Sequence, residues 1–143
     1  MSKLAAELKD DPLQRDYADK GDVACAESLA EKNRSVVGSV SRPDFVIWAA
    51  AGPRAVIEDI ALDLASPFRA SALALRDFVS GNSESLDLSN ASVRGLLTAW
   101  ATSGLITQVQ HDSLIALATH TVSRAEELGI TDASANAVME ARK

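Results

Sequence analysis

Two histidines, one cysteine and two pairs of neighbouring carboxylates are the side chains with which this sequence could do chemistry. His111 and His120 are candidate metal ligands or proton carriers. They lie nine residues apart in what the pattern predicts as one helix. At about 100° per residue this separation turns them to opposite faces, so they cannot share a metal ion within one chain. We expect both to be structural or surface residues.

The carboxylate pairs lie on predicted helices that already have an inward apolar face. Glu58-Asp59 and Glu126-Glu127 therefore indicate solvated helix surface rather than a buried acid–base pair. No glutamate stands three residues before either histidine, and the zinc-protease spacing is absent. We expect no metal site.

Cys25 would be a nucleophile only if the fold brought a base to it. It is the sole cysteine, which excludes an internal disulfide and any multi-cysteine metal site. Its alanine neighbours favour a small buried residue instead. Serines occur at predicted helix caps, and neither a G-x-S-x-G turn nor a phosphate-binding glycine pattern occurs. The sequence thus predicts no catalytic or cofactor-binding residue and a protein that is not an enzyme; an enzyme would need a pocket joining Cys25 or His111 to a carboxylate.

Composition narrows the classes of partner. The 143 residues carry a formal net charge of −6, and the Lys and Arg residues are scattered, so direct nucleic-acid binding is disfavoured. No apolar run approaches the roughly 18 residues of a membrane span, and the first residues lack a signal-peptide pattern. Aromatic residues make up only 4% of the chain, so the core must be built from Ala, Val, Leu and Ile. We expect a soluble protein with no membrane contact.

Helix start and stop signals punctuate the chain. Cap residues, prolines at first helical positions and glycines at helix ends bound helical segments near 12–20, 22–32, 41–52, 53–65, 66–81, 90–104, 107–129 and 131–143. Gly81 stands where a left-handed residue would end a helix, and Thr107 with Gln110 predicts a capping box for the longest one. The fold class predicted is all-α: a single compact domain, residues 1–143, of about seven short-to-medium helices.

One stretch is β-like. Residues 34–40 contain three valines but are short and include a glycine, which favours an extended connector over a sheet. Residues 82–88 are polar and are expected to form an exposed loop. Alternation with a period of two is otherwise nearly absent.

A few side chains are candidates for an interaction surface. Leu73 points away from the apolar stripe of its helix, and Leu105 and Ile106 lie in a short turn. Leu73 on the one hand, and Leu105 with Ile106 on the other, could form a patch that faces a partner. We favour the alternative that they pack at the edge of the core. Arg69 and Arg76 share one side of their helix and could form a small basic face, although salt bridges to the many carboxylates are a simpler explanation. Arg124 is expected to pair with Glu126 or Glu127.

Three segments resemble a known family. Residues 123–129, Ser-Arg-Ala-Glu-Glu-Leu-Gly, followed by a short helix ending in Ala141-Arg142, are similar to the end of a family of small proteins encoded by tailed bacteriophages. Members also begin with a short Leu/Ala helix, then an Asp-Pro-Leu…Tyr segment, which here is residues 11–17. Residues 87–94 are similar to a capped segment that precedes their last helices. Residues 34–80 have no counterpart, and Asn33 lies farther from Leu29 than in the family pattern.

The resemblance implies a non-enzymatic structural or assembly protein of the virion, in head–tail connection, the tail or the collar. Such a protein would form a homo-oligomer and contact other phage structural proteins, in the virion and in the host cytoplasm during assembly. The resemblance supplies no catalytic residue. Two alternatives remain: a capsid decoration protein, and a small acidic modulator that binds a host or phage protein.

Overall fold

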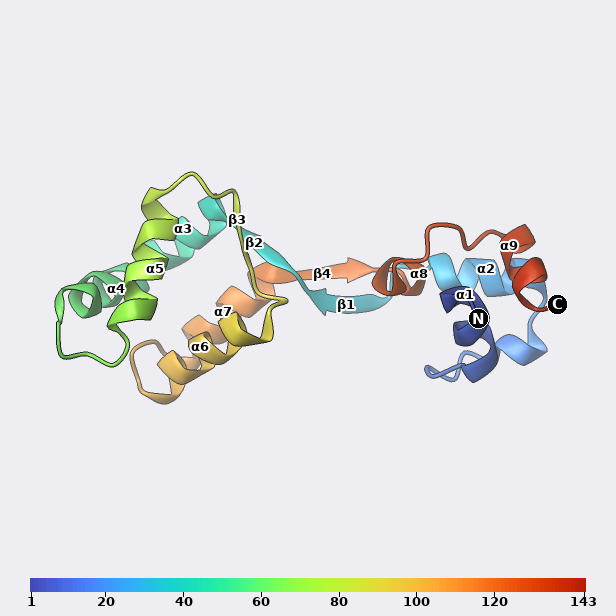
Figure 1. Ribbon diagram of the computed structural model, residues 1–143, viewed down its shortest axis with the longest axis horizontal. Helices are drawn as coiled ribbons and strands as arrows, with labels where there is room; N and C mark the ends of the chain where they lie inside the picture. The colour runs from blue at the N-terminus through green and yellow to red at the C-terminus, as the bar shows by residue number, and fades with distance from the viewer. The chain divides into compact units, whose positions relative to one another are not determined.

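The computed structural model describes residues 1–143 and contains nine α-helices, one short 3-10 helix and four short strands (Figure 1). The strands form two small two-stranded sheets, one of β1 (Arg34–Val37) with β4 (Thr119–Val122) and one of β2 (Ser39–Ser41) with β3 (Ser85–Asp87). The all-α prediction is therefore wrong, and the protein is mixed α/β. None of the helices has the length and apolar character that crossing a membrane requires.

The chain divides into two compact units. Unit 1 is formed by Met1–Val36 together with Thr121–Lys143, and unit 2 by Val37–His120. Each unit has a hydrophobic cluster of its own, where the sequence predicts one interior. That residues 1–143 form a single domain stays a prediction.

Unit 1 is built from segments far apart in the sequence. Its core consists of small and aliphatic residues around Tyr17, Cys25 and Leu29, all fully buried. Its elements are α1 (Lys3–Asp10), η1 (Tyr17–Asp19), α2 (Asp22–Ala30), α8 (Arg124–Leu128) and α9 (Ala135–Ala141). Helix α1 contacts α9, and α2 contacts both α8 and α9.

Unit 2 contains most of the aromatic side chains. Phe45 packs against Trp48 and Phe78, with ring centroids 5.2 Å and 5.1 Å away, and Trp100 packs edge-on against Phe68. Such tilted pairs add to the burial of apolar area in stabilising the core. Besides β2 and β3, its elements are α3 (Arg42–Ala50), α4 (Pro53–Leu62), α5 (Arg69–Ser80), α6 (Ala91–Thr102) and α7 (Gln108–Ala118).

Residues 34–40 are not an extended connector. They supply β1 and most of β2, and β2 pairs antiparallel with β3 in the register Val40 to Leu86. The predicted exposed loop 82–88 therefore holds a strand. The partner of β1 is β4, more than eighty residues along the chain. A strand whose partner is so distant leaves no local signal beyond its valines, which explains the error.

The predicted helix 107–129 is interrupted. The first part, α7, begins with the expected capping box of Thr107 and Gln110 and ends at Ala118. The strand β4 follows, and a second capping box, formed by Ser123 and Glu126, begins α8. Because Thr121 and Val122 continue the apolar helical spacing, the strand is hidden in the sequence pattern.

Other cap signals have mixed outcomes. Ser41 caps α3 through its side-chain oxygen, as predicted. Of the two residues that could cap α6, Ser89 and Asn90, it is Asn90 whose side-chain oxygen does so. Gly129 ends α8 in a left-handed conformation with φ 69°. Gly81, in contrast, is extended with φ −88°. Asp11 does not start a helix at Pro12. Its carboxylate instead accepts the backbone N–H groups of Arg15 and Asp16, both at 2.8 Å, in a turn that leads to η1.

Candidate functional site

A shallow groove lies on unit 2 between α3 and α7. It has a volume of about 440 Å³, and it is lined by Asp44, Ile47, Trp48, Ser113, Ala116 and Leu117. Aliphatic and aromatic atoms therefore form most of its wall, and one carboxylate stands among them.

The apolar residues of the groove are exposed because each helix buries a different face. In α3 the inward face is Phe45, Trp48 and Ala49, which leaves Ile47 with 71% of its surface exposed. In α7 the inward residues are Leu114 and Ala118, and Leu117 is 42% exposed. Surface helices of globular domains usually carry polar residues at such positions.

The floor of the groove is formed by Trp48. Its indole Nε1 donates a hydrogen bond to the backbone oxygen of Gln110 at 2.8 Å, and its ring packs on Phe45. The indole is thus tied to both walls of the groove, and its orientation is set before any ligand arrives. A rigid aromatic surface of this kind loses little conformational entropy on binding.

Asp44 is the one charged residue of the groove. It lies in the first turn of α3, where its backbone N–H donates to Ser41 Oγ at 3.2 Å. Its side chain is exposed and takes part in none of the ion pairs or side-chain hydrogen bonds of the protein. The carboxylate is therefore available to a partner.

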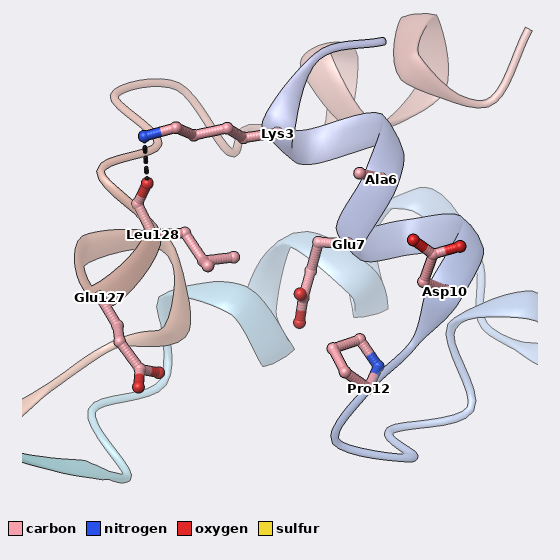
Figure 2. Close-up of a pocket in the computed structure, with 7 residues that line it drawn as sticks. All are labelled: Lys3, Ala6, Glu7, Asp10, Pro12, Glu127 and Leu128. Atoms are coloured by element: carbon pink, nitrogen blue, oxygen red, sulfur yellow. Dashed lines mark hydrogen bonds between the residues drawn. The ribbon is translucent and has the colours of Figure 1, made fainter.

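A second cavity, also of about 440 Å³, lies within unit 1 (Figure 2). Lys3 bridges its rim by donating from Nζ to the backbone oxygen of Leu128 at 3.0 Å, and the carboxylate of Glu7 points into the space between Leu128 and Pro12. Glu7 is only 5% exposed, which is unusual for a carboxylate and calls for a partner.

Arg124 is that partner. Its Nε and one terminal nitrogen donate to the two carboxylate oxygens of Glu7, each at 2.9 Å, in a bidentate pair. Its other terminal nitrogen donates to Glu127 at 3.0 Å, and Arg34 donates to the same carboxylate at 2.9 Å. Hydrogen bonds from the two arginines, Arg34 first, lower the pKa of Glu127 to about 2. Hydrogen bonding to Glu7 raises the pKa of Arg124 above its usual range.

This ion network joins α1, β1 and α8 within unit 1. The expected pairing of Arg124 with Glu127 is confirmed. Glu127 is exposed on α8, so it belongs to the helix surface, as expected, and forms its ion pairs there. Because both oxygens of Glu7 are held by Arg124, the cavity beside it presents no free Glu7 carboxylate. The network stabilises unit 1.

The two histidines are not on one helix. His111 is in α7, where its Nδ1 lies 3.0 Å from Asp112, whereas His120 is in β4, where its Nε2 lies 3.2 Å from the backbone oxygen of Ser39. No group of three or more potential metal ligands forms around either. Cys25 is fully buried, as predicted, with its thiol 3.5 Å from the backbone oxygen of Tyr17.

The predicted interaction residues lie away from the groove lining. Ile106 is 3% exposed and belongs to the core of unit 2, and Leu73 and Leu105 are half-buried against that core. Ile106 is therefore a core residue rather than part of a partner-facing patch. Arg69 donates from Nε to the backbone oxygen of Ala61 at 3.1 Å, which occupies part of its guanidinium, and Arg76 is half-buried on the same helix. Their role as an interaction surface stays a prediction.

The residues of the groove are not among the interaction residues predicted from the sequence. That prediction assumes that each helix has a single apolar face, which is directed to the core. A signal is nevertheless present. Ile47 lies outside the stripe of α3, and α7 has large apolar residues on more than one face, Val109 and Leu117 among them. A helix that is apolar on two faces needs two contacts.

Comparisons of this chain with family models, with curated proteins and with solved structures find no match. The function is therefore inferred from the geometry of the two units and from the resemblance of the three segments.

Proposed function

We propose that this chain is a non-enzymatic structural or assembly protein of a tailed bacteriophage, and that it acts through protein–protein contacts made by the α3/α7 groove. The observation that supports the contact is the exposure of Ile47 and Leu117 beside the fixed ring of Trp48. Contiguous exposed apolar surface costs solubility, so it is retained where a partner covers it.

The phage assignment rests on the resemblance, and unit 1 gives two of its three segments a physical meaning. Residues 11–17 and 123–129, at opposite ends of the chain, meet in the same core through Tyr17 and Ala125. Asp11 orders the first segment, and Ser123 begins the helix of the second. The motif residues are thus among those that determine the fold of unit 1, which is the pattern expected of a shared fold.

The division of roles between the units follows from these contacts. The two segments of unit 1 that resemble the phage family, residues 11–17 and 123–129, make contacts within that unit. Residues 34–80 have no counterpart in the family pattern, and they include α3, which forms one wall of the groove. We infer that unit 1 is the part held in common with the phage proteins and that unit 2 carries the contact particular to this chain. The contact serves head–tail joining, the tail or the collar.

Mass spectrometry of purified phage particles tests the proposal. The wild-type chain is expected in the particles, and the double variant Ile47→Lys/Leu117→Lys is expected to be strongly depleted, because two buried charges would oppose the contact. The matched control is Leu64→Lys, since Leu64 is also an exposed aliphatic residue of unit 2 but does not line the groove. Absence of the wild-type chain from particles would overturn the structural role.

A further inference from the structure

We propose that the α3/α7 groove binds one amphipathic α-helix of a partner protein, which lays its aliphatic face on Ile47, Trp48 and Leu117 and places a lysine or arginine beside Asp44. The proposal rests on the function proposed above and specifies the chemistry of the partner. A second copy of this chain is the competing occupant, and its binding would be a different result of the test.

The dimensions of the groove fit a helix. Val109, Ser113 and Leu117 stand at positions i, i+4 and i+8 of α7 and so form one line along its surface, about 12 Å long at 1.5 Å per residue. Val109 is 75% exposed and extends the apolar strip past the groove lining. A strip of a little over two turns matches the i, i+3/i+4, i+7 spacing with which a helix inserts its anchors.

The side chains of the groove vary in size in a way that admits a helix backbone. Ser113 and Ala116 are small and lie between the larger Val109 and Leu117 on α7, and Trp48 supplies a flat surface opposite. Small residues allow close approach, and large ones provide the area that anchors bury. An extended peptide would need unpaired strand edges for its backbone, and the groove is walled by two helices, whose backbone groups are already bonded.

Charge identifies the polar side of the partner. Asp44 is unpaired at the groove, and unit 2 contains eight acidic residues against five arginines, counted along residues 37–120. A basic helix would be drawn to this surface and would give Asp44 the ion pair that it lacks. The basic residue is expected next to the aliphatic face, within reach of the first turn of α3.

Charge also disfavours a second copy as the occupant. The most exposed leucines outside the groove, Leu62 and Leu64, flank Asp63, and the helix α4 ends at Leu62. Inserting these leucines into the groove of another copy would bring one carboxylate towards Asp44. The inward stripes of α5 and α6 are already used by the core of unit 2.

The experiment uses the full chain and three model peptides of about 15 residues, the length at which a helix begins to form alone. The first has leucines in an i, i+3, i+4, i+7 stripe and lysines elsewhere, the second replaces lysine by glutamate, and the third is a scrambled lysine peptide without the stripe. Binding is followed by anisotropy of the labelled peptide and by isothermal titration. We expect the striped lysine peptide to bind at least tenfold more tightly than either of the others.

Charge reversal identifies the site. Asp44→Lys is expected to weaken the striped lysine peptide at least tenfold and to strengthen the glutamate peptide. Asp59→Lys is the matched control, because Asp59 is an exposed carboxylate on α4 outside the groove, and it makes the same change in net charge. Ile47→Lys should abolish binding, whereas Leu64→Lys should not.

Three results would overturn the inference: equal binding of the striped and scrambled peptides, equal effects of Asp44→Lys and Asp59→Lys, or self-association of the wild-type chain that Ile47→Lys abolishes. The last result would identify a second copy as the occupant. If one of these results were obtained and the chain were still found in phage particles, only the binding of a helix would be overturned, and the structural role would stand. The two proposals can therefore be tested independently.

Discussion

Glu127 is the residue whose ionisation bears most directly on unit 1, because its carboxylate accepts from both Arg34 and Arg124. Its pKa in the folded protein is about 2, below the ordinary value of 4.5. A lowered carboxyl pKa stabilises the folded state at pH values above the ordinary pKa, and this contribution is lost as the pH falls from about 4.5 towards 2.

Replacing Glu127 tests this dependence. We expect Glu127→Gln to reduce the free energy of unfolding of unit 1 by about 1 kcal/mol at pH 7, a value that allows for screening by solvent, and by much less near pH ~2.5. Urea unfolding followed by the labelling of Cys25 measures it. Glu140→Gln is the control, since its pair with Lys143 is exposed and should matter little at either pH. A loss that did not depend on pH would contradict the role assigned to the ion network.

Position 38 favours glycine because the ring of His120 lies close to it, and not because the backbone there has a left-handed conformation. A Cβ atom at this position would lie 2.9 Å from Cδ2 of His120, whose Nε2 faces the backbone oxygen of Ser39. We expect Gly38→Ala to cost about 1 kcal/mol, because the ring must move from its place. In the His120→Ala background the cost should largely disappear. A double-mutant cycle in urea, read from tryptophan fluorescence, checks this coupling, and additive effects would rule it out.

At the scale of elements, the capping boxes explain why α7 and α8 are separate helices. Ser123 is 4% exposed, its hydroxyl accepts from the backbone N–H of Glu126, and the Glu126 carboxylate accepts from the backbone N–H of Ser123 at 2.7 Å. These bonds begin a new helix at Arg124, shortly after α7 has ended at Ala118. The strand β4 occupies the stretch between them.

Ser123→Ala tests the contribution of this cap. We expect the free energy of unfolding of unit 1 to fall by about 1 kcal/mol, the usual effect of removing a serine N-cap. The Cys25 labelling curve should shift to lower urea, while tryptophan fluorescence should not. Ser134→Ala is a useful comparison, because Ser134 caps α9 from a more exposed position. An equal shift in both probes would show that the two units unfold together.

The sequence predicts the elements that local contacts determine. The caps at Ser41, Asn90 and Thr107 and the helix end at Gly129 depend on neighbours two to four residues away, and the sequence predicts a helix boundary at each of them. The strands β1 and β4 depend on each other across more than eighty residues, and neither is predicted. The groove escapes prediction for a related reason: whether Leu117 faces the core or the solvent is decided by where α3 packs, which no local pattern contains.

At the scale of the whole molecule, the two units have separate cores and separate reporters. Trp48 and Trp100 both belong to unit 2, and they are the only tryptophans, whereas Cys25 belongs to unit 1. Tryptophan fluorescence therefore follows unit 2, and thiol labelling follows unit 1. Each unit can therefore be observed by itself without an engineered probe residue.

We expect two unfolding transitions, because no buried residue belongs to both hydrophobic clusters. Urea titrations read by the two probes should give different midpoints, and Leu97→Ala should shift only the tryptophan curve. The size of that shift should correspond to the roughly 2–5 kcal/mol usual for a buried leucine. Coincident midpoints in the wild type and in the variant would establish the single cooperative domain that the length of the chain suggests.

Unit 1 is assembled from residues 1–36 and 121–143, and this has a consequence for synthesis on the ribosome. Leu4, Leu8 and Tyr17 leave the exit tunnel first but have no complete core until Ala125 and Val138 are made. At ordinary translation speeds that interval is on the order of ten seconds. Unit 2, which is continuous, can fold during it, while the early segment remains with its apolar residues uncovered and within reach of chaperones.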